Sequence, residues 1–246
     1  MKYIKTAVVI MALFVSSAAA DESSAGNADE TSTCGTEIDF NSKYLWHGSA
    51  YSGGAVLEPS VWVSLKDFTA TLWSNYEISE NLNEADAVIE YSHETGKFLL
   101  EPSLSYYTYY HQPDSTPIIE FSAKISRPLS DKFSLYTSQN FYFLNGDVGD
   151  SYFGGLGIDF ETGITNSIKL SVSPFAGWGS IIYNRENFGC SKWAFDLISA
   201  DISLEYAFYG GLYLKPHFTY ALIPDKTLIG DDRSNTSAGI AVGAEF

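Results

Sequence analysis

The sequence predicts an all-β protein, a transmembrane antiparallel up-and-down β-barrel of about twelve strands. Three observations predict it. Short segments alternate between apolar and polar residues, and no helical periodicity interrupts them. The segments are about ten residues or longer, which suits a tilted strand crossing a bilayer. The connections between them alternate between long and short, as in outer-membrane barrels.

The N-terminus has the features of a secretory signal peptide, which we predict over residues 1–20. A short basic region precedes the apolar run 7–15, and small residues at 18–20 offer a cleavage site. Residues 21–35 are acidic, small and without periodicity, which predicts a disordered leader. The barrel is then expected over residues 36–246, in the outer membrane of a cell that exports it.

The net charge of −16 constrains the partners of the protein. A nucleic acid is not among them, because its phosphates require a basic surface. An acidic exported protein instead attracts cations.

The expected strands each have one face without charge. In the second segment Leu57 and Val61 alternate with Glu58, Ser60 and Ser64, which places the two sets on opposite faces. The segments are 36–47, 55–65, 67–78, 85–94, 97–110, 117–126, 132–143, 151–161, 167–178, 193–207, 211–221 and 235–246.

The apolar face is expected to point outward, towards lipid. A barrel of twelve strands is too wide for apolar side chains to fill, whereas roughly eight strands enclose a packed interior. Aromatic residues also gather near segment ends, as in the interfacial girdles of membrane barrels. These residues are Tyr44, Trp46, Tyr106, Tyr110, Phe141, Phe143, Phe218, Tyr220 and Phe246.

The chain closes on an alternating segment that ends in Phe246. Closure of a barrel requires the last strand to pair with the first, because lipid leaves no backbone group unbonded. We therefore expect this segment to pair with segment 36–47.

One stretch resembles a known family. Residues 42–77, "SKYLWHGSAYSGGAVLEPSVWVSLKDFTATLWSNYE", resemble the opening of the TorF-type outer-membrane porin family, a group of small barrels. Tyr44, Trp46 and Gly48 match that opening, and His47 stands where an arginine is expected. The resemblance implies a porin-like barrel. A terminal phenylalanine also resembles the signal that barrel-assembly machinery recognises, which implies that role for Phe246.

The charged face is expected to line the lumen and to select ions. Its acids outnumber its bases, so the lumen should favour cations and exclude anions. The alternative is that these groups pair into a sealed polar core. The candidate lumen residues are Glu58, Glu77, Glu90, Glu101, Glu120, Lys124, Lys169, Asp201, Glu205 and Lys215.

These features predict a porin-like diffusion channel for small solutes or cations, in contact with outer-membrane lipid. One alternative is a non-conducting structural or adhesive barrel that presents its outer loops. A lipid-modifying enzyme is a weaker alternative, because adjacent Ser92 and His93 face opposite ways on a strand. No catalytic residue, metal site or cofactor is predicted. The run 145–150, "NGDVGD", is a turn in preference to a calcium loop.

Two cysteines, Cys34 and Cys190, are expected at opposite rims of the barrel. The rims lie about 25 Å apart, and a disulfide needs Cα atoms within about 7 Å. The cysteines could pair only if the leader passed up through the lumen as a plug. Otherwise both remain free thiols.

Overall fold

The computed structural model describes residues 32–78, 83–110, 116–144 and 147–246. The predicted signal peptide, leader residues 21–31 and the first two residues of the predicted turn 145–150 lie outside these ranges. Among the described residues, no helix is both long and apolar enough to cross a membrane.

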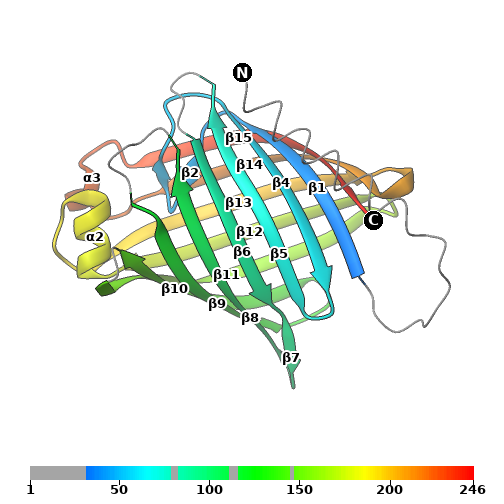
Figure 1. Ribbon diagram of the computed structural model, residues 1–246, viewed down its shortest axis with the longest axis horizontal. Helices are drawn as coiled ribbons and strands as arrows, with labels where there is room; N and C mark the ends of the chain where they lie inside the picture. Colours follow the sequence, from blue (N-terminus) through cyan, green and yellow to red (C-terminus); the bar gives the residue numbers. More distant parts are fainter. Residues whose placement is uncertain (1–31, 79–82, 111–115, 145–146) are drawn as a thin grey trace.

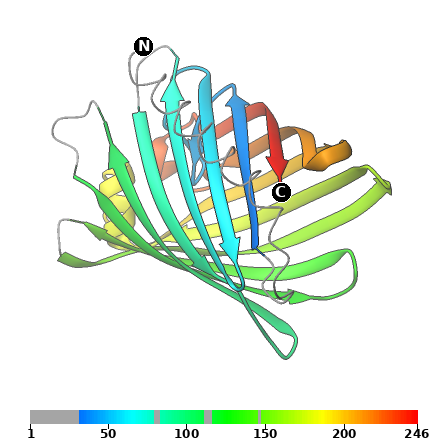
Figure 2. The same cartoon turned by 45° about the vertical axis from the view of Figure 1, so that its right-hand side comes forward.

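The chain forms one closed antiparallel barrel (Figures 1 and 2). Strand β1 pairs with β15, so the first and last strands close the wall. Strands β6 and β7 both pair with β8 and act as one interrupted wall strand, which gives twelve strands in the barrel. The wall strands are β1 (Ser32–Asn41), β4 (Val56–Leu65), β5 (Phe68–Glu77), β6 (Asn83–Tyr91), β7 (His93–Thr95), β8 (Phe98–Tyr109), β9 (Ile118–Pro128), β10 (Phe133–Leu144), β11 (Asp147–Thr165), β12 (Ile168–Gly179), β13 (Ala194–Ala207), β14 (Leu212–Leu222) and β15 (Ser234–Glu245).

The predicted orientation of the two strand faces is confirmed. On β1, Ile38 and Phe40 are each 44% exposed on the outside, whereas Asn41 is 7% exposed. The same alternation places Leu72 of β5 and Leu104 of β8 outside, each more than half exposed. A belt of exposed apolar side chains on a closed sheet is the surface that a bilayer solvates.

The two ends of the barrel differ as the loop lengths predicted. Tight turns join strands at the end that holds the C-terminus, and one of them contains the short helix η1 (Tyr209–Gly211). The opposite end holds α2 (Ile181–Phe188) and α3 (Lys226–Ile229) within long connections (Figure 1). Helix α2 begins at the capping side chain of Ser180 and ends at Gly189, which has a left-handed φ of 67°.

The first predicted strand is wrong at both ends. Strand β1 spans Ser32–Asn41 instead of 36–47, so part of the expected leader is in the wall and residues 42–55 leave it. Tyr44 and Trp46 are therefore not part of an outer girdle. Their alternation is typical of a strand, but it continues only into a small hairpin inside the barrel. The other predicted segments coincide with wall strands to within a few residues.

The cysteines do not pair. Cys34 belongs to β1, where its N–H donates to the carbonyl of Phe246 at 3.0 Å and its carbonyl accepts from the Phe246 N–H at 2.9 Å. Cys190 follows α2 at the other end, and both thiols are free. A Cys34–Cys190 disulfide, which would have required the leader to pass through the lumen, is therefore not formed.

Candidate functional site

The main feature of the lumen is the segment 42–55, which we call the strap. It contains a hairpin of β2 (Leu45–Trp46) and β3 (Ser49–Ala50), with His47 and Gly48 at its tip. Both tip residues have positive φ, 46° and 85°, as a two-residue hairpin turn of this hand requires. Gly48 suits that position because it has no Cβ.

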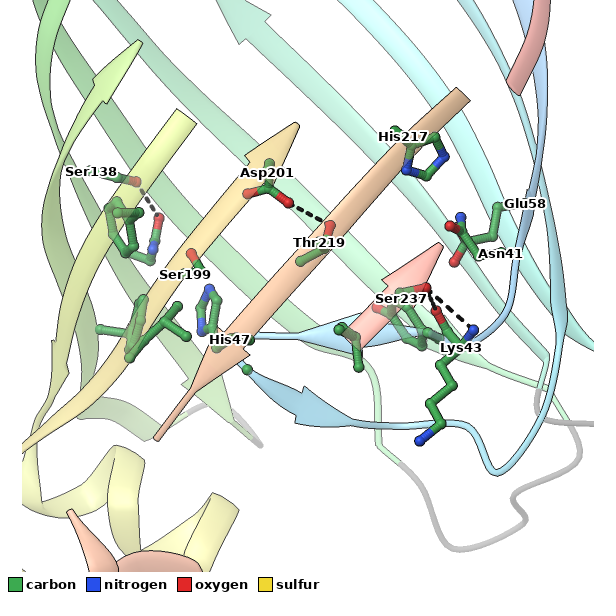
Figure 3. Close-up of a pocket in the computed structure, with 18 of the residues that line it drawn as sticks. Asn41, Lys43, His47, Glu58, Ser138, Ser199, Asp201, His217, Thr219 and Ser237 are labelled. Atoms are coloured by element: carbon green, nitrogen blue, oxygen red, sulfur yellow. Dashed lines mark hydrogen bonds between the residues drawn. The ribbon is translucent and has the colours of Figure 1, made fainter. Parts of the chain in front are cut away.

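Hydrogen bonds to the wall hold the strap at both sides. Ser237 of β15 donates its hydroxyl to the carbonyl of Lys43 at 2.7 Å (Figure 3). Asn235 donates its amide to the carbonyl of Gly48 at 2.8 Å. At the far end of the strap, the N–H of Gly54 donates to the Glu77 carboxylate at 2.9 Å. The strap is thus fixed to β15 and to β5.

The tip of the strap packs across the lumen into a group that we call the aromatic cluster: Trp46, His47, Tyr142, Phe153 and Tyr183. The His47 ring lies between two others, with centroids 4.2 Å from Trp46 and 3.8 Å from Phe153, and both pairs are nearly parallel. Phe153 and Tyr183 are each 1% exposed and Tyr142 is 4% exposed. The cluster therefore joins the strap to β10, β11 and α2.

His47 is electrostatically unusual within this cluster. Its Nδ1 lies 2.8 Å from the Tyr183 hydroxyl, and its ring is enclosed by aromatic neighbours. Loss of water around the ring lowers the pKa of His47 from 6.5 to about 3. The imidazole is therefore neutral at physiological pH.

A cavity of about 520 Å³ lies in the lumen beside the strap (Figure 3). Strap residues form part of its boundary, and β1, β4, β5 and the strands from β9 to β15 form the rest. Hydroxyl and amide groups of Ser138, Asn140, Ser199 and Thr219 face it. Such a lining can hydrogen-bond a polar solute without fixing one charge type.

Charged groups on the cavity wall are partly paired. The Lys124 ammonium lies 3.1 Å from the Asp159 carboxylate. His217 Nε2 lies 2.9 Å from the Asp39 carboxylate. Asp201 accepts a hydrogen bond from the hydroxyl of Thr219 at 2.5 Å.

The predicted lumen residues lie on the inner face, but only some of them come together. Glu58, Lys124 and Asp201 line the cavity. Glu77 instead binds the strap, and Glu120 accepts from the Tyr107 hydroxyl at 2.9 Å.

The remaining predicted residues lie outside the cavity lining. Lys215 forms an ion pair with Glu37 at 2.7 Å, and Lys169 forms one with Glu161 at 3.7 Å. Glu90, Glu101 and Glu205 also lie on inner strand faces. These three acids have no ion-pair partner among the described residues.

Sequence reasoning missed the strap and the aromatic cluster. The dipeptide His47-Gly48 is a weak hairpin-turn signal that could have ended the first strand earlier. Nothing local in the sequence indicates that Tyr142, Phe153 and Tyr183 pack against this turn. The described residues also contain no group of three or more side chains placed to hold a metal ion.

Comparison with known proteins supports the architecture. No family model and no curated protein matches the sequence, so the TorF-type resemblance stays a prediction. Among solved structures, the KdgM porin is similar, with a TM-score of 0.56 and 12% identity over 87% of this chain and 99% of that one. It has also been solved in complex with disordered oligogalacturonate. The NanC porin is similar with a TM-score of 0.52 and 13% identity over 86% of this chain and 98% of that one. At this identity the likeness concerns the fold alone: the chain is a closed twelve-stranded antiparallel barrel, similar in fold to these porins.

Proposed function

We propose that the protein is an outer-membrane diffusion channel for small solutes, with a lumen that favours cations. The observation that carries the proposal is the polar cavity beside the strap, inside a barrel whose fold is that of porins. The strap crosses the lumen from β1 to β11, so it is the constriction of the proposed channel. The neutral hydroxyls and amides of the wall suit hydrated solutes.

The charge of the inner wall supports the cation preference. The lysines of the strand faces, Lys124, Lys169 and Lys215, are each already engaged by a carboxylate. Acids such as Glu58 and Glu205 have no ion-pair partner among the described residues. An excess of fixed negative charge along a pore raises the local concentration of cations and lowers that of anions.

A bilayer experiment tests both parts of the proposal. Refolded protein in a planar bilayer should give discrete conductance steps. In a potassium chloride gradient, the reversal potential should lie closer to the potassium equilibrium potential than to the chloride equilibrium potential. Conductance steps whose reversal potential lies closer to the chloride equilibrium potential would refute the cation preference but not the channel. A correctly folded barrel that gives no steps would refute the channel.

A specific observation also favours a second candidate, a non-conducting structural barrel. Tyr142, Phe153 and Tyr183 of the aromatic cluster are each at most 4% exposed, and His47 joins the strap to Tyr183 of α2. If it closes the outer mouth, the barrel presents its long connections without transport. The same conductance experiment separates this candidate from the first.

Nothing in the described part of the chain supports the enzyme alternative. A serine hydrolase needs a serine bonded to a histidine. His47 is bonded to Tyr183, and His217 to Asp39. His111 lies outside the described residues.

Export, lipid contact and assembly belong to the same proposal. The outward apolar belt is the surface for outer-membrane lipid, and residues 1–20 would direct export. The barrel-assembly machinery would recognise Phe246, which is the role that the resemblance implies.

A further inference from the structure

The carboxylate of Glu58 has an unusual environment at the edge of the cavity. Asn75 donates to one of its oxygens at 2.8 Å, and Asn41 donates to the other at 2.8 Å. Amide donors fix the direction of the carboxylate but do not cancel its charge. Glu58 takes part in no ion pair within the part of the chain that the structure describes, so amide groups, and not a cation, hold its carboxylate in place.

Two buried acceptor oxygens on the neighbouring strands β5 and β6 lack a donor among the described residues. The Oδ1 atom of Asn75 is buried and has no hydrogen-bond partner among the described residues, and Asn75 is only 1% exposed. Asp86 also has a buried oxygen without a partner there. In the strand register Asn75 lies opposite Glu84, and Trp73 lies opposite Asp86. A buried acceptor without a donor is costly, and a donor or a positive charge relieves that cost.

Two aromatic rings complete this corner of the cavity. Tyr44 projects from the strap and Trp73 from β5, and their ring centroids lie 5.7 Å apart at 44°. Both residues line the same cavity as Glu58. The faces of such rings attract organic cations, whose apolar body also packs on the ring.

We infer that Glu58, Asn75, Tyr44 and Trp73 form a binding station for a small organic cation that carries N–H donors, a primary ammonium or a guanidinium group. The ammonium head would donate to Glu58, and its carbon chain would lie on Tyr44 and Trp73. Asn75 positions the carboxylate from behind. This inference rests on the proposed function, because it names the solute class that the channel would pass.

The surroundings match this ligand better than an inorganic ion. A bare metal ion gains from oxygen ligands alone, whereas here aromatic faces stand beside the carboxylate. A cavity of about 520 Å³ also has room for a chain of several carbons. Asp201 lies on the wall of the same cavity and could receive the second end of a diamine.

The experiment uses 1,4-diaminobutane as the probe on the refolded full barrel. Calorimetry in detergent measures binding, and current block in a planar bilayer measures occupancy of the passage. Glu58→Gln should weaken binding about tenfold, because a hydrogen bond to a charged group contributes about 1.5–3 kcal/mol. The variant should fold, because Asn75 can turn its amide and offer its free oxygen to the new side chain.

The matched control is Glu205→Gln, which removes one inner-face carboxylate outside the cavity lining. It should leave diamine binding almost unchanged. Trp73→Leu keeps every charge and removes a ring, and it should weaken the diamine more than it weakens potassium.

Each outcome decides the inference. Equal losses in Glu58→Gln and Glu205→Gln would mean diffuse charge and would overturn the station. Absence of diamine binding to the wild type would also overturn it. The same holds if potassium or sodium competes with the diamine at equal affinity and Trp73→Leu has no effect on diamine binding. Binding by calorimetry without any conductance would sustain the station and refute the channel.

Discussion

The Nδ1 atom of His47 lies 2.8 Å from the hydroxyl oxygen of Tyr183. This contact joins the tip of the strap to helix α2, which belongs to a long connection at the other side of the barrel. A second contact runs parallel to it, since the Tyr51 hydroxyl donates to Asn187 of α2 at 3.0 Å. The position of the strap therefore depends on contacts between segments more than one hundred residues apart in sequence.

Gly48→Ala should loosen the strap. At a φ of 85° an alanine is strained, and its Cβ would lie 2.8 Å from a methyl group of Leu197, which is 5% exposed. Strain of this kind costs about 1–3 kcal/mol. We expect a higher single-channel conductance and more current fluctuation, measured in planar bilayers.

Gly96→Ala is the control for that variant. Gly96 also has a positive φ, 63°, but nothing lies within 4 Å of its added Cβ. It should lose a similar amount of stability and keep the wild-type conductance. If both variants conduct alike, the strap does not set the width of the passage.

Acid should weaken the strap through His47. Its pKa is lowered to about 3 in the folded protein, so the unfolded chain takes up the proton more readily. The stability that the neutral ring contributes is complete above its ordinary pKa of 6.5 and is lost as the pH falls from 6.5 towards 3, by at most about 1.4 kcal/mol per pH unit. The ionisable groups against the ring, Tyr142 and Tyr183, stay uncharged over that range.

Thermal unfolding of the refolded barrel at pH 7 and pH 4.5 measures this effect. Acidic side chains of the lumen also titrate, so the comparison is between variants. His47→Gln, which can still bond Tyr183, should lower the unfolding temperature less on acidification than the wild type does. His93→Gln, at an exposed position of β7, should behave as the wild type. Identical acid responses in all three proteins would contradict the role of His47.

The barrel could be predicted because its rule is local. A residue two positions along a strand returns to the same face, so the spacing of Leu57, Val61 and Val63 already separates outside from inside. Lipid reinforces that rule, since every strand of the wall faces the same apolar solvent. The inner-face positions of Glu58 and Asp201 follow from the same count.

The strap could not be predicted because its determinants are distant. Tyr44 and Trp46 alternate as in a strand, but Tyr44 packs against Trp73 of β5 and Trp46 against Tyr183 of α2. Within a polar lumen, a dry pocket arises only where several segments meet. The ion pairs of the lysines could not be predicted for the same reason. The arrangement of neighbouring strands, and not the local sequence, brings Lys124 within 3.1 Å of Asp159.

Lys124→Met should make the channel more selective for cations. The substitution removes one positive charge from the cavity wall and leaves Asp159, which the Ser173 hydroxyl still holds at 2.8 Å. The reversal potential in a potassium chloride gradient should move towards the potassium equilibrium value. Lys169→Met changes the net charge equally, but its 3.7 Å pair is exposed and lies outside the cavity lining, so the shift should be smaller. Equal shifts would mean that the cavity is not where ions are selected.

Phe246→Ala should reduce assembly in cells without greatly changing the stability of the finished barrel. The side chain of Phe246 is 59% exposed, and its backbone alone makes the reciprocal bonds to Cys34. Those bonds survive the substitution, so refolded protein in detergent should unfold within about 1 kcal/mol of the wild type. In cells, the fraction that runs as a heat-modifiable folded barrel should fall. Phe40→Ala removes the same ring from the outer face of β1, where Phe40 is 44% exposed, and it should assemble normally. If Phe246→Ala also assembles normally, the ring is not what the assembly machinery recognises, and the closing bonds to Cys34 are sufficient.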